Sequence, residues 1–207
     1  IRDSSTSRGL GDVYKRQVKE REYLTEDELK AVMTHEFADS KLAYIRDIFI
    51  FASFTALSFV DIQELTNDNI VEVNGEKWIL SKRHKTKVAF QVKLLDIPLQ
   101  IVERYRPMQK DNRIFPGLNY WSICKPLKRM IRECGITKSI SFHCSRHGFA
   151  TLALSKGMPI ESVSRVLGHT NIVTTQLYAK ITTQKLDNDL TMFGDKLSKT
   201  FNGITMS

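Results

Sequence analysis

Four side chains suited to handling a phosphate group lie within a short stretch of the C-terminal half. His143 and Arg146 are three residues apart, and Tyr178 follows His169 by nine residues. A tyrosine oxygen can attack phosphorus and form a covalent phosphotyrosine. Arginine stays charged and offers a forked donor for phosphoryl oxygens, while histidine donates hydrogen bonds or moves protons near neutral pH. The set therefore fits phosphoryl transfer, which proteins accelerate mainly by positioning and electrostatic stabilisation.

A cluster of basic residues forms a second candidate element, in the turn between two β-rich segments. Lys85 can protonate a leaving oxygen. Lys82, Arg83 and Lys87 fit contacts to a DNA backbone, whereas an ordinary solvated turn is the alternative interpretation.

His147 stands one helical turn after His143, so the two could form half of a zinc site. No third ligand has suitable spacing, and we expect no metal. His147 fits packing or hydrogen bonding behind the site, with a direct catalytic role as the other interpretation.

Four motifs in chain order resemble the catalytic domain of the tyrosine recombinases, the phage integrase family. The resemblance covers about residues 22–195. The first motif covers residues 55–62, and R-x-K-T follows at Arg83, Lys85 and Thr86. H-x-x-R-H stands at His143, Arg146 and His147. The last motif is L-G-H-T at Leu167, Gly168, His169 and Thr170, followed by Tyr178.

The first motif departs from the family pattern at one position. The family usually has T-G-L-R-x-x-D/E there, and this chain has Ser58 where the first catalytic arginine would stand. Three interpretations remain open: an inactive protein, a slow enzyme, or an enzyme in which another basic residue takes over. Arg83 is the nearest candidate by motif, although a phosphate contact is its more common role.

The resemblance implies a site-specific DNA recombinase, the integrase of a mobile element such as a phage or transposon. Tyr178 would form a 3′-phosphotyrosyl link, Arg146, His143 and His169 would stabilise the phosphoryl group, and Lys85 would be the general acid. No cofactor is expected, because the phosphotyrosyl ester retains the energy of the broken bond. The implied partners are double-stranded DNA, a homotetramer formed by exchange of C-terminal helices, and accessory DNA-bending proteins.

Two other functions stay open. A type IB topoisomerase would use similar chemistry without strand exchange and would relax plasmids without a specific site. A catalytically impaired DNA-binding relative, with Ser58 marking the loss of the first arginine, would bind DNA without forming a covalent adduct.

The elements that must position these residues follow from capping signals and apolar periodicity. They predict a mostly α fold with a small three-stranded antiparallel β-sheet, as in a tyrosine recombinase catalytic domain. Strands are expected over 69–73, 78–81 and 88–94, with a hairpin turn at Asn74-Gly75. Helices are expected over 26–37, 41–57, 58–65, 98–106, 120–134, 143–155, 159–167, 171–181 and 186–201.

Composition limits the function classes. The 207 residues are 42% hydrophobic, which excludes a largely disordered chain, and the net charge of +8 favours a polyanionic partner. The longest apolar stretch is too short to cross a membrane. Three cysteines without a C-x-x-C pattern fit a reducing, cytoplasmic setting, here expected to be bacterial and nucleoid-associated on DNA.

The back-translated sequence of the N-terminal residues contains a repeated nucleotide string. Residues 1–4 and 13–17 can both be back-translated with the nucleotide string ATAAGAGACAG, in different frames. We therefore expect residues 1–17 to derive from a sequencing adaptor, whereas a flexible native tail is the alternative. We also expect the gene to be truncated at its 5′ end, so that the N-terminal core-binding domain of the family is missing. The expected organisation is 1–17 non-native or disordered, 18–183 catalytic domain and 184–207 C-terminal amphipathic helix and tail.

Overall fold

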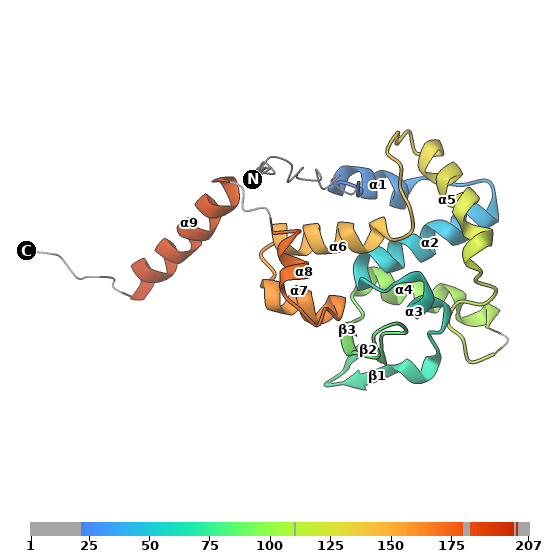
Figure 1. Ribbon diagram of the computed structural model, residues 1–207, viewed down its shortest axis with the longest axis horizontal. Coiled ribbons are helices and arrows are strands. Elements are labelled where there is room, and N and C mark those ends of the chain that lie inside the picture. Colours follow the sequence, from blue (N-terminus) through green and yellow to red (C-terminus); the bar gives the residue numbers. More distant parts are fainter. Residues whose placement is uncertain (1–21, 110, 180–182, 201, 203–207) are drawn as a thin grey trace, which may run out of the picture.

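The computed structural model describes residues 22–109, 111–179, 183–200 and 202, so the expectation for residues 1–17 lies outside them. The fold is mostly helical with one small antiparallel sheet, as predicted (Figure 1). The helices are α1 (Glu26–Thr34), α2 (Ser40–Thr55), α3 (Phe59–Gln63), α4 (Asp96–Tyr105), α5 (Tyr120–Glu133), α6 (Cys144–Ser155), α7 (Ile160–Leu167), α8 (Val173–Gln176) and α9 (Thr183–Thr200), with 3-10 turns η1 (Asn67–Asn69) and η2 (Arg106–Met108). The strands are β1 (Ile70–Val73), β2 (Glu76–Lys82) and β3 (Ala89–Lys93).

Helix α2 forms the centre of the core. Residues 47–53 are all buried, so every face of this part of the helix is covered by other elements. It packs against α1, α4, α5 and α6. Phe49 and Phe51 are among its largest buried side chains, and each such residue contributes about 1.5–3 kcal/mol on burial. α2 is therefore the rigid support on which the surrounding helices rest.

A capping box starts each of two helices, and the one at Thr25 confirms the signal that the sequence gives for the first helix. Thr25 and Glu28 form a capping box at the start of α1, with the Glu28 amide donating to Thr25 Oγ1 over 3.2 Å. Ser58 and Asp61 form a second capping box at α3. Ser58 is thus a helix cap, and α3 begins one residue later than the sequence suggested.

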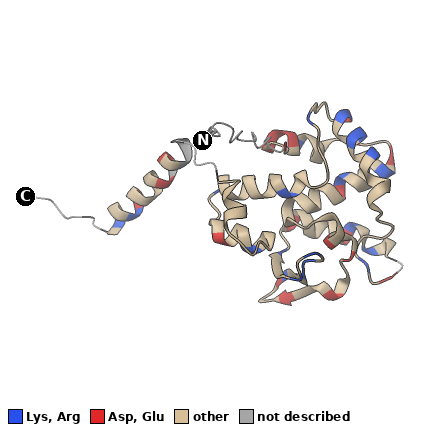
Figure 2. Cartoon of the chain, viewed as in Figure 1, with Lys and Arg blue, Asp and Glu red and all other residues tan. Residues whose placement is uncertain are grey.

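The sheet has the order β1-β2-β3 with antiparallel pairing throughout. Asn74 and Gly75 both have positive φ, at 53° and 78°, as the predicted tight hairpin requires. The β2–β3 connection is closed by the Lys87 amide, which donates to the Arg83 carbonyl over 2.8 Å. Figure 2 marks in blue the basic residues of this connection, and further basic residues along α5.

One predicted helix is much shorter than expected. The segment 171–181 was expected to be helical throughout, but α8 covers only Val173–Gln176. Tyr178 lies in the turn after α8, where its amide donates to the Thr175 carbonyl over 3.0 Å. Tertiary contacts of Thr175 with His169 and of Tyr178 with His147 take the place of further helical turns here.

Helix α9 carries the apolar stripe predicted for the C-terminal segment. Leu190 and Phe193 are 59% and 57% exposed, and Leu186 and Leu197 are exposed as well. α9 extends away from the other helices (Figure 1). Within the described ranges, no helix has the length and apolar character needed to cross a membrane.

Candidate active site

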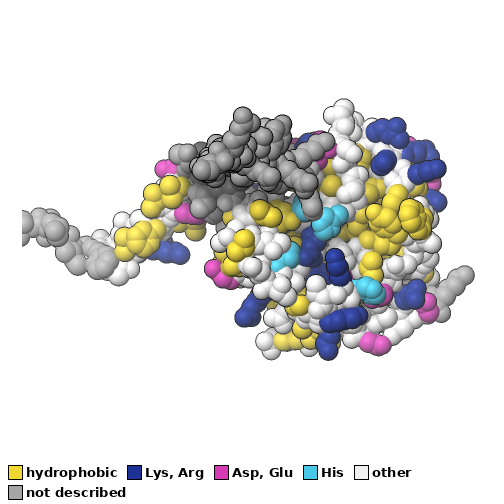
Figure 3. All heavy atoms as spheres, viewed as in Figure 1, with side chains coloured by type: hydrophobic (Ala, Val, Ile, Leu, Met, Phe, Trp, Pro, Cys, Tyr) yellow, Lys and Arg dark blue, Asp and Glu magenta, His cyan; other side chains and the backbone are white. Residues whose placement is uncertain are grey.

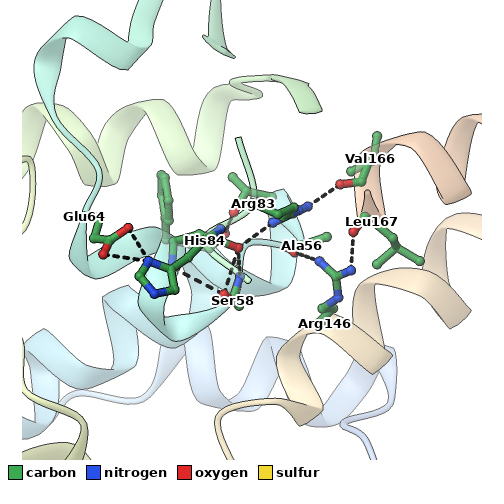
Figure 4. A network of polar contacts seen from close by, with 11 residues as sticks. Ala56, Ser58, Glu64, Arg83, His84, Arg146, Val166 and Leu167 are labelled. Atoms are coloured by element: carbon green, nitrogen blue, oxygen red, sulfur yellow. Dashed lines mark hydrogen bonds and ion pairs between the residues drawn. The ribbon is translucent and has the colours of Figure 1, made fainter. Parts of the chain in front are cut away.

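Arg146 is held at the junction of three elements. Its Nη1 donates to the carbonyl of Ala56 over 2.7 Å, and its Nη2 donates to the carbonyl of Leu167 (Figure 4). Ala56 ends α2 with a left-handed φ of 55°, which explains why glycine suits this place in the first motif. Burial, together with the positive charge of Arg83, lowers the pKa of Arg146 to about 10, so it remains a cation at neutral pH.

Arg83 does not share the exposed position of Lys82 and Lys87, with which the sequence groups it as a candidate contact to a DNA backbone. Only 5% of it is exposed. Its guanidinium lies 4.0 Å from the centre of the Phe90 ring, its Nη1 donates to Asp61 Oδ2 over 2.8 Å, and its Nη2 donates to the Val166 carbonyl. The side chain therefore turns inward, because a carboxylate and an aromatic face are available beneath the hairpin.

Asp61 joins the first motif to the hairpin. Its carboxylate accepts hydrogen bonds from the Ser58 hydroxyl over 2.7 Å and from the His84 amide over 3.0 Å, besides the Arg83 guanidinium. Burial raises the pKa of Asp61, but these three donors outweigh burial and hold the pKa below its ordinary value. A second link, between His84 Nδ1 and Glu64 at 2.8 Å, joins the same turn to the end of α3.

His169 follows the glycine that ends α7. Gly168 has a φ of 62°, and the His169 amide donates to the Ser164 carbonyl over 3.0 Å, which closes the end of the helix. Nδ1 of His169 lies 2.8 Å from Oγ1 of the buried Thr175. Burial and the nearby charges of Arg146 and Arg83 lower the pKa of His169 to about 4, so its imidazole is neutral at pH 7.

Tyr178 is half-buried against a small apolar cluster that joins α6 and α7. Its Oη lies 2.6 Å from Nδ1 of the buried His147. The His147 ring stands edge-on to the ring of His143 at 4.6 Å, and His143 itself is exposed just before α6. The structure thus brings His143, His147 and Tyr178 together.

The lysines of the turn lie apart from this group. Lys82, Lys85 and Lys87 are exposed, and within the described part of the chain no hydrogen bond or ion pair joins Lys85 to the residues above. Figure 3 shows Lys, Arg and His side chains gathered at the middle of one face of the molecule. Such a face is a suitable surface for a polyanion.

Sequence reasoning missed two features. Asp61 lies within the first motif, and its contacts with the hairpin cannot be read from spacing. Gly168 lies so close to Arg83 that a Cβ added there would stand 2.9 Å from Nε. The glycine in L-G-H-T was the available signal for this close approach. Across residues 22–109, 111–179 and 183–200, no group of three or more His, Cys, Asp or Glu residues could hold a metal ion.

Two curated relatives match most of the chain. Tyrosine recombinase XerA of Pyrococcus horikoshii is 32% identical over 177 residues, which cover 79% of this chain and 58% of the relative. Tyrosine recombinase XerC of Lactobacillus leichmannii is 27% identical and covers 80% of this chain and 60% of the relative. The chain therefore spans about three fifths of the length of these two proteins.

Solved structures share the fold. The crystal structure of XerA recombinase superposes with a TM-score of 0.67 at 21% identity, covering 84% of this chain and 65% of that chain. The Tn1549 transposon integrase in complex with a circular intermediate DNA gives a TM-score of 0.73 at 17% identity, covering 89% of this chain and 69% of that chain.

The family assignment rests on the extent of the match as well as on the site. The model of the phage integrase family matches residues 22–185, which contain the residues gathered around Arg146. The expectation of a tyrosine recombinase fold is confirmed. This chain belongs to the phage integrase family of tyrosine recombinases.

Proposed function

We propose that the chain is the catalytic domain of a site-specific DNA recombinase that cuts and rejoins DNA through a 3′-phosphotyrosyl intermediate. The observation that carries this proposal is the convergence of Arg146, His169 and Tyr178 from three separate segments. The Tyr178 phenol is close enough to Arg146 to influence its pKa, and Arg146 in turn lowers the pKa of His169. A nucleophile and a phosphate-binding cation thus share one site.

In the cleavage step, Tyr178 Oη attacks the scissile phosphorus. The Oη–P bond forms, the bond from phosphorus to the 5′ oxygen breaks, and Lys85 gives a proton to that oxygen. The phenol proton passes to a base, and Nδ1 of His147 is an acceptor at hydrogen-bond distance. Arg146, His143 and His169 stabilise the charge on the remaining phosphoryl oxygens.

In the rejoining step, a 5′ hydroxyl from a partner strand attacks the phosphotyrosine and releases Tyr178. The number of phosphate ester bonds is the same before and after, so the exchange needs no external energy source. DNA is the substrate that the basic face and the family membership favour. The element and its target sequence are left to experiment.

Covalent capture tests this function. The chain is incubated with nicked, end-labelled duplex DNA that has the sequence of the ends of the mobile element encoding this chain. The products are separated on a denaturing gel. We expect label to migrate with protein, and to be absent with Tyr178→Phe. DNA binding without an adduct would favour the impaired relative with Ser58, and relaxation of any supercoiled plasmid would favour topoisomerase activity.

Assembly is a separate part of the proposal. The exposed apolar side chains of α9 support docking onto a neighbouring protomer in a homotetramer, with docking on its own domain as the alternative. On a native gel, complexes that hold several protomers on DNA migrate more slowly than a single bound protomer. The double substitution Leu190→Asp/Phe193→Asp would abolish these slower complexes and leave adduct formation on a single site intact. If the slower complexes persist, α9 does not hold the protomers together.

A further inference from the structure

We propose that Arg83 is a further catalytic residue, which binds the phosphoryl oxygens beside Arg146 and takes the place of the arginine that is absent at Ser58. The proposal rests on the proposed function and adds a second guanidinium to its phosphate site. The family's first arginine would stand at the start of α3, where this chain has Ser58, whereas the Arg83 side chain reaches the site from the β2–β3 hairpin.

The first support is the position of the Arg83 side chain. A basic residue that only touches the DNA backbone is expected at the surface, whereas Arg83 is 5% exposed. Asp61 and the ring of Phe90 fix its guanidinium from two sides, at 2.8 Å and 4.0 Å. Preorganised donors of this kind lose little on meeting a developing charge, because they are already oriented.

The second support is the neighbouring position of the two guanidiniums. Arg83 donates to the carbonyl of Val166 and Arg146 donates to the carbonyl of Leu167, the next residue (Figure 4). The charge of Arg83 contributes to the lowered pKa of both Arg146 and His169. Arg83 is buried and Arg146 is half-buried, and two cations placed in this way favour an anion between them.

The third support is a buried hydrogen-bond donor of Arg83 that has no acceptor. In the described part of the chain, Arg83 Nε is the one buried side-chain nitrogen or oxygen without a hydrogen-bond partner. Buried donors without a partner are uncommon in native proteins and call for an explanation. A phosphate oxygen entering the site would provide an acceptor for this guanidinium.

The fourth support links Arg83 to the departure in the first motif. The Ser58 hydroxyl and the Arg83 guanidinium both donate to Oδ2 of Asp61, over 2.7 Å and 2.8 Å. The short Ser58 side chain thus ends at the carboxylate, and the guanidinium comes to the same carboxylate from the turn that follows β2. Gly168 leaves the room that this side chain needs.

Oxyanion binding tests the proposal without relying on activity. Tungstate, a tetrahedral oxyanion, is titrated into the chain by calorimetry. Because Arg83→Met alone would leave Asp61 buried without its partner, the principal variant is Arg83→Met/Asp61→Asn, with circular dichroism to verify folding. We expect tungstate to bind roughly 10- to 100-fold more weakly, the usual effect of losing a charged hydrogen bond. Arg106→Met, in an exposed pair with Glu103, is the control for loss of an arginine.

Two further variants sharpen the test. The variant Ser58→Arg/Arg83→Met places an arginine at position 58, where the family usually has one, and removes the arginine at position 83. Tungstate affinity is expected to recover in this variant. Gly168→Ala should weaken tungstate binding by displacing Arg83, whereas Gly135→Ala, at a φ of 73° with nothing within 4 Å of the added Cβ, should not.

The outcomes separate the two proposals. Wild-type affinity in folded Arg83→Met/Asp61→Asn, or no tungstate binding by the unaltered chain, would overturn the role of Arg83. Adduct formation that depends on Tyr178 and is unchanged in Arg83→Lys would overturn that role as well, while leaving the recombinase function in place. A loss of adduct by about 10²–10³-fold in Arg83→Lys, with folding retained, supports it.

Discussion

The hydroxyl oxygen of Tyr178 lies 2.6 Å from Nδ1 of His147, a histidine that is only 4% exposed. His147 comes directly after Arg146 on α6, so one helix holds both the Arg146 guanidinium and the imidazole that contacts Tyr178. The position of the tyrosine is therefore tied to the position of the arginine. α8 alone, with four residues, is too short to provide that link.

Substitution of His147 tests this link. We expect His147→Phe, which keeps the ring volume and removes the acceptor, to lower adduct formation about 10- to 100-fold, because a small displacement of a nucleophile has an effect of that order. His147→Asn, whose amide oxygen stands near the place of Nδ1, should recover part of the rate. Equal rates in His147→Phe and the unaltered chain would show that the contact does not orient Tyr178.

Lys85 should be dispensable when the leaving group needs no proton. We expect Lys85→Ala to slow cleavage of ordinary DNA by about 10²–10⁴-fold. A substrate with sulfur at the bridging 5′ position should restore cleavage, because a thiol with a pKa near 8.5 leaves readily as its anion. Arg146→Ala should gain nothing from the sulfur, because the role proposed for Arg146 is to stabilise the phosphoryl group and not the leaving oxygen. Failure of sulfur to rescue Lys85→Ala would remove Lys85 from the role of general acid.

The neutral His169 makes the stability of the fold depend on pH. Its pKa of about 4 lies below the ordinary 6.5, so the unfolded chain binds more protons between these values. The contribution of His169 to stability is present above about pH 6.5 and falls as the pH drops towards 4. Urea unfolding at several pH values should show this fall, and His169→Gln should flatten it. An unchanged slope in His169→Gln would assign the effect to other groups.

Removal of Asp61 should destabilise the protein strongly. Asp61→Ala leaves the charge of Arg83 buried without a partner, which costs about 3–5 kcal/mol for pairs of this kind. Glu64→Ala is the matched control, because Glu64 binds the same turn through His84 but lies at the surface, where pairs contribute about 0–1 kcal/mol. Free energies of unfolding from urea titration compare the two. Equal losses would mean that the Asp61–Arg83 pair is not the main stabilising contact of the turn.

Lys82 and Lys87 should contribute to DNA affinity without regard to sequence. Each alanine substitution is expected to reduce the slope of log affinity against log salt concentration by about 1. Lys156, which pairs with Glu26 at 2.8 Å on α1, is the control. Fluorescence anisotropy with two unrelated duplexes measures the slopes, and a slope that stays constant in both variants would place the DNA elsewhere.

Much of the fold could be predicted because its signals are local. The capping box of Thr25, the Asn74-Gly75 turn and the apolar run in α2 depend on neighbours in sequence, and all three are confirmed. The length of α8 could not be predicted, because tertiary contacts of Thr175 and Tyr178 replace further helical turns.

The site was predictable as a set of residue types but not as a set of contacts. The motifs identified Arg146, His169 and Tyr178, which the structure gathers. The burial of Arg83 depends on Asp61, which is 22 residues away in sequence, and on Val166, which is 83 residues away. Spacing along the chain does not report contacts over such separations, so the sequence grouped Arg83 with Lys82 and Lys87 as contacts to a DNA backbone.

The carbonyl oxygens of Val166 and Leu167 give the end of α7 a further consequence. They occupy guanidinium donors of Arg83 and Arg146. A phosphodiester that uses those donors must exchange with oxygens already in place, and it meets a partly negative helix end. The ground state is thereby bound less tightly than two free arginines would bind it. In the proposed recombination reaction, which has to release its DNA after each exchange, such internal competition would limit product retention.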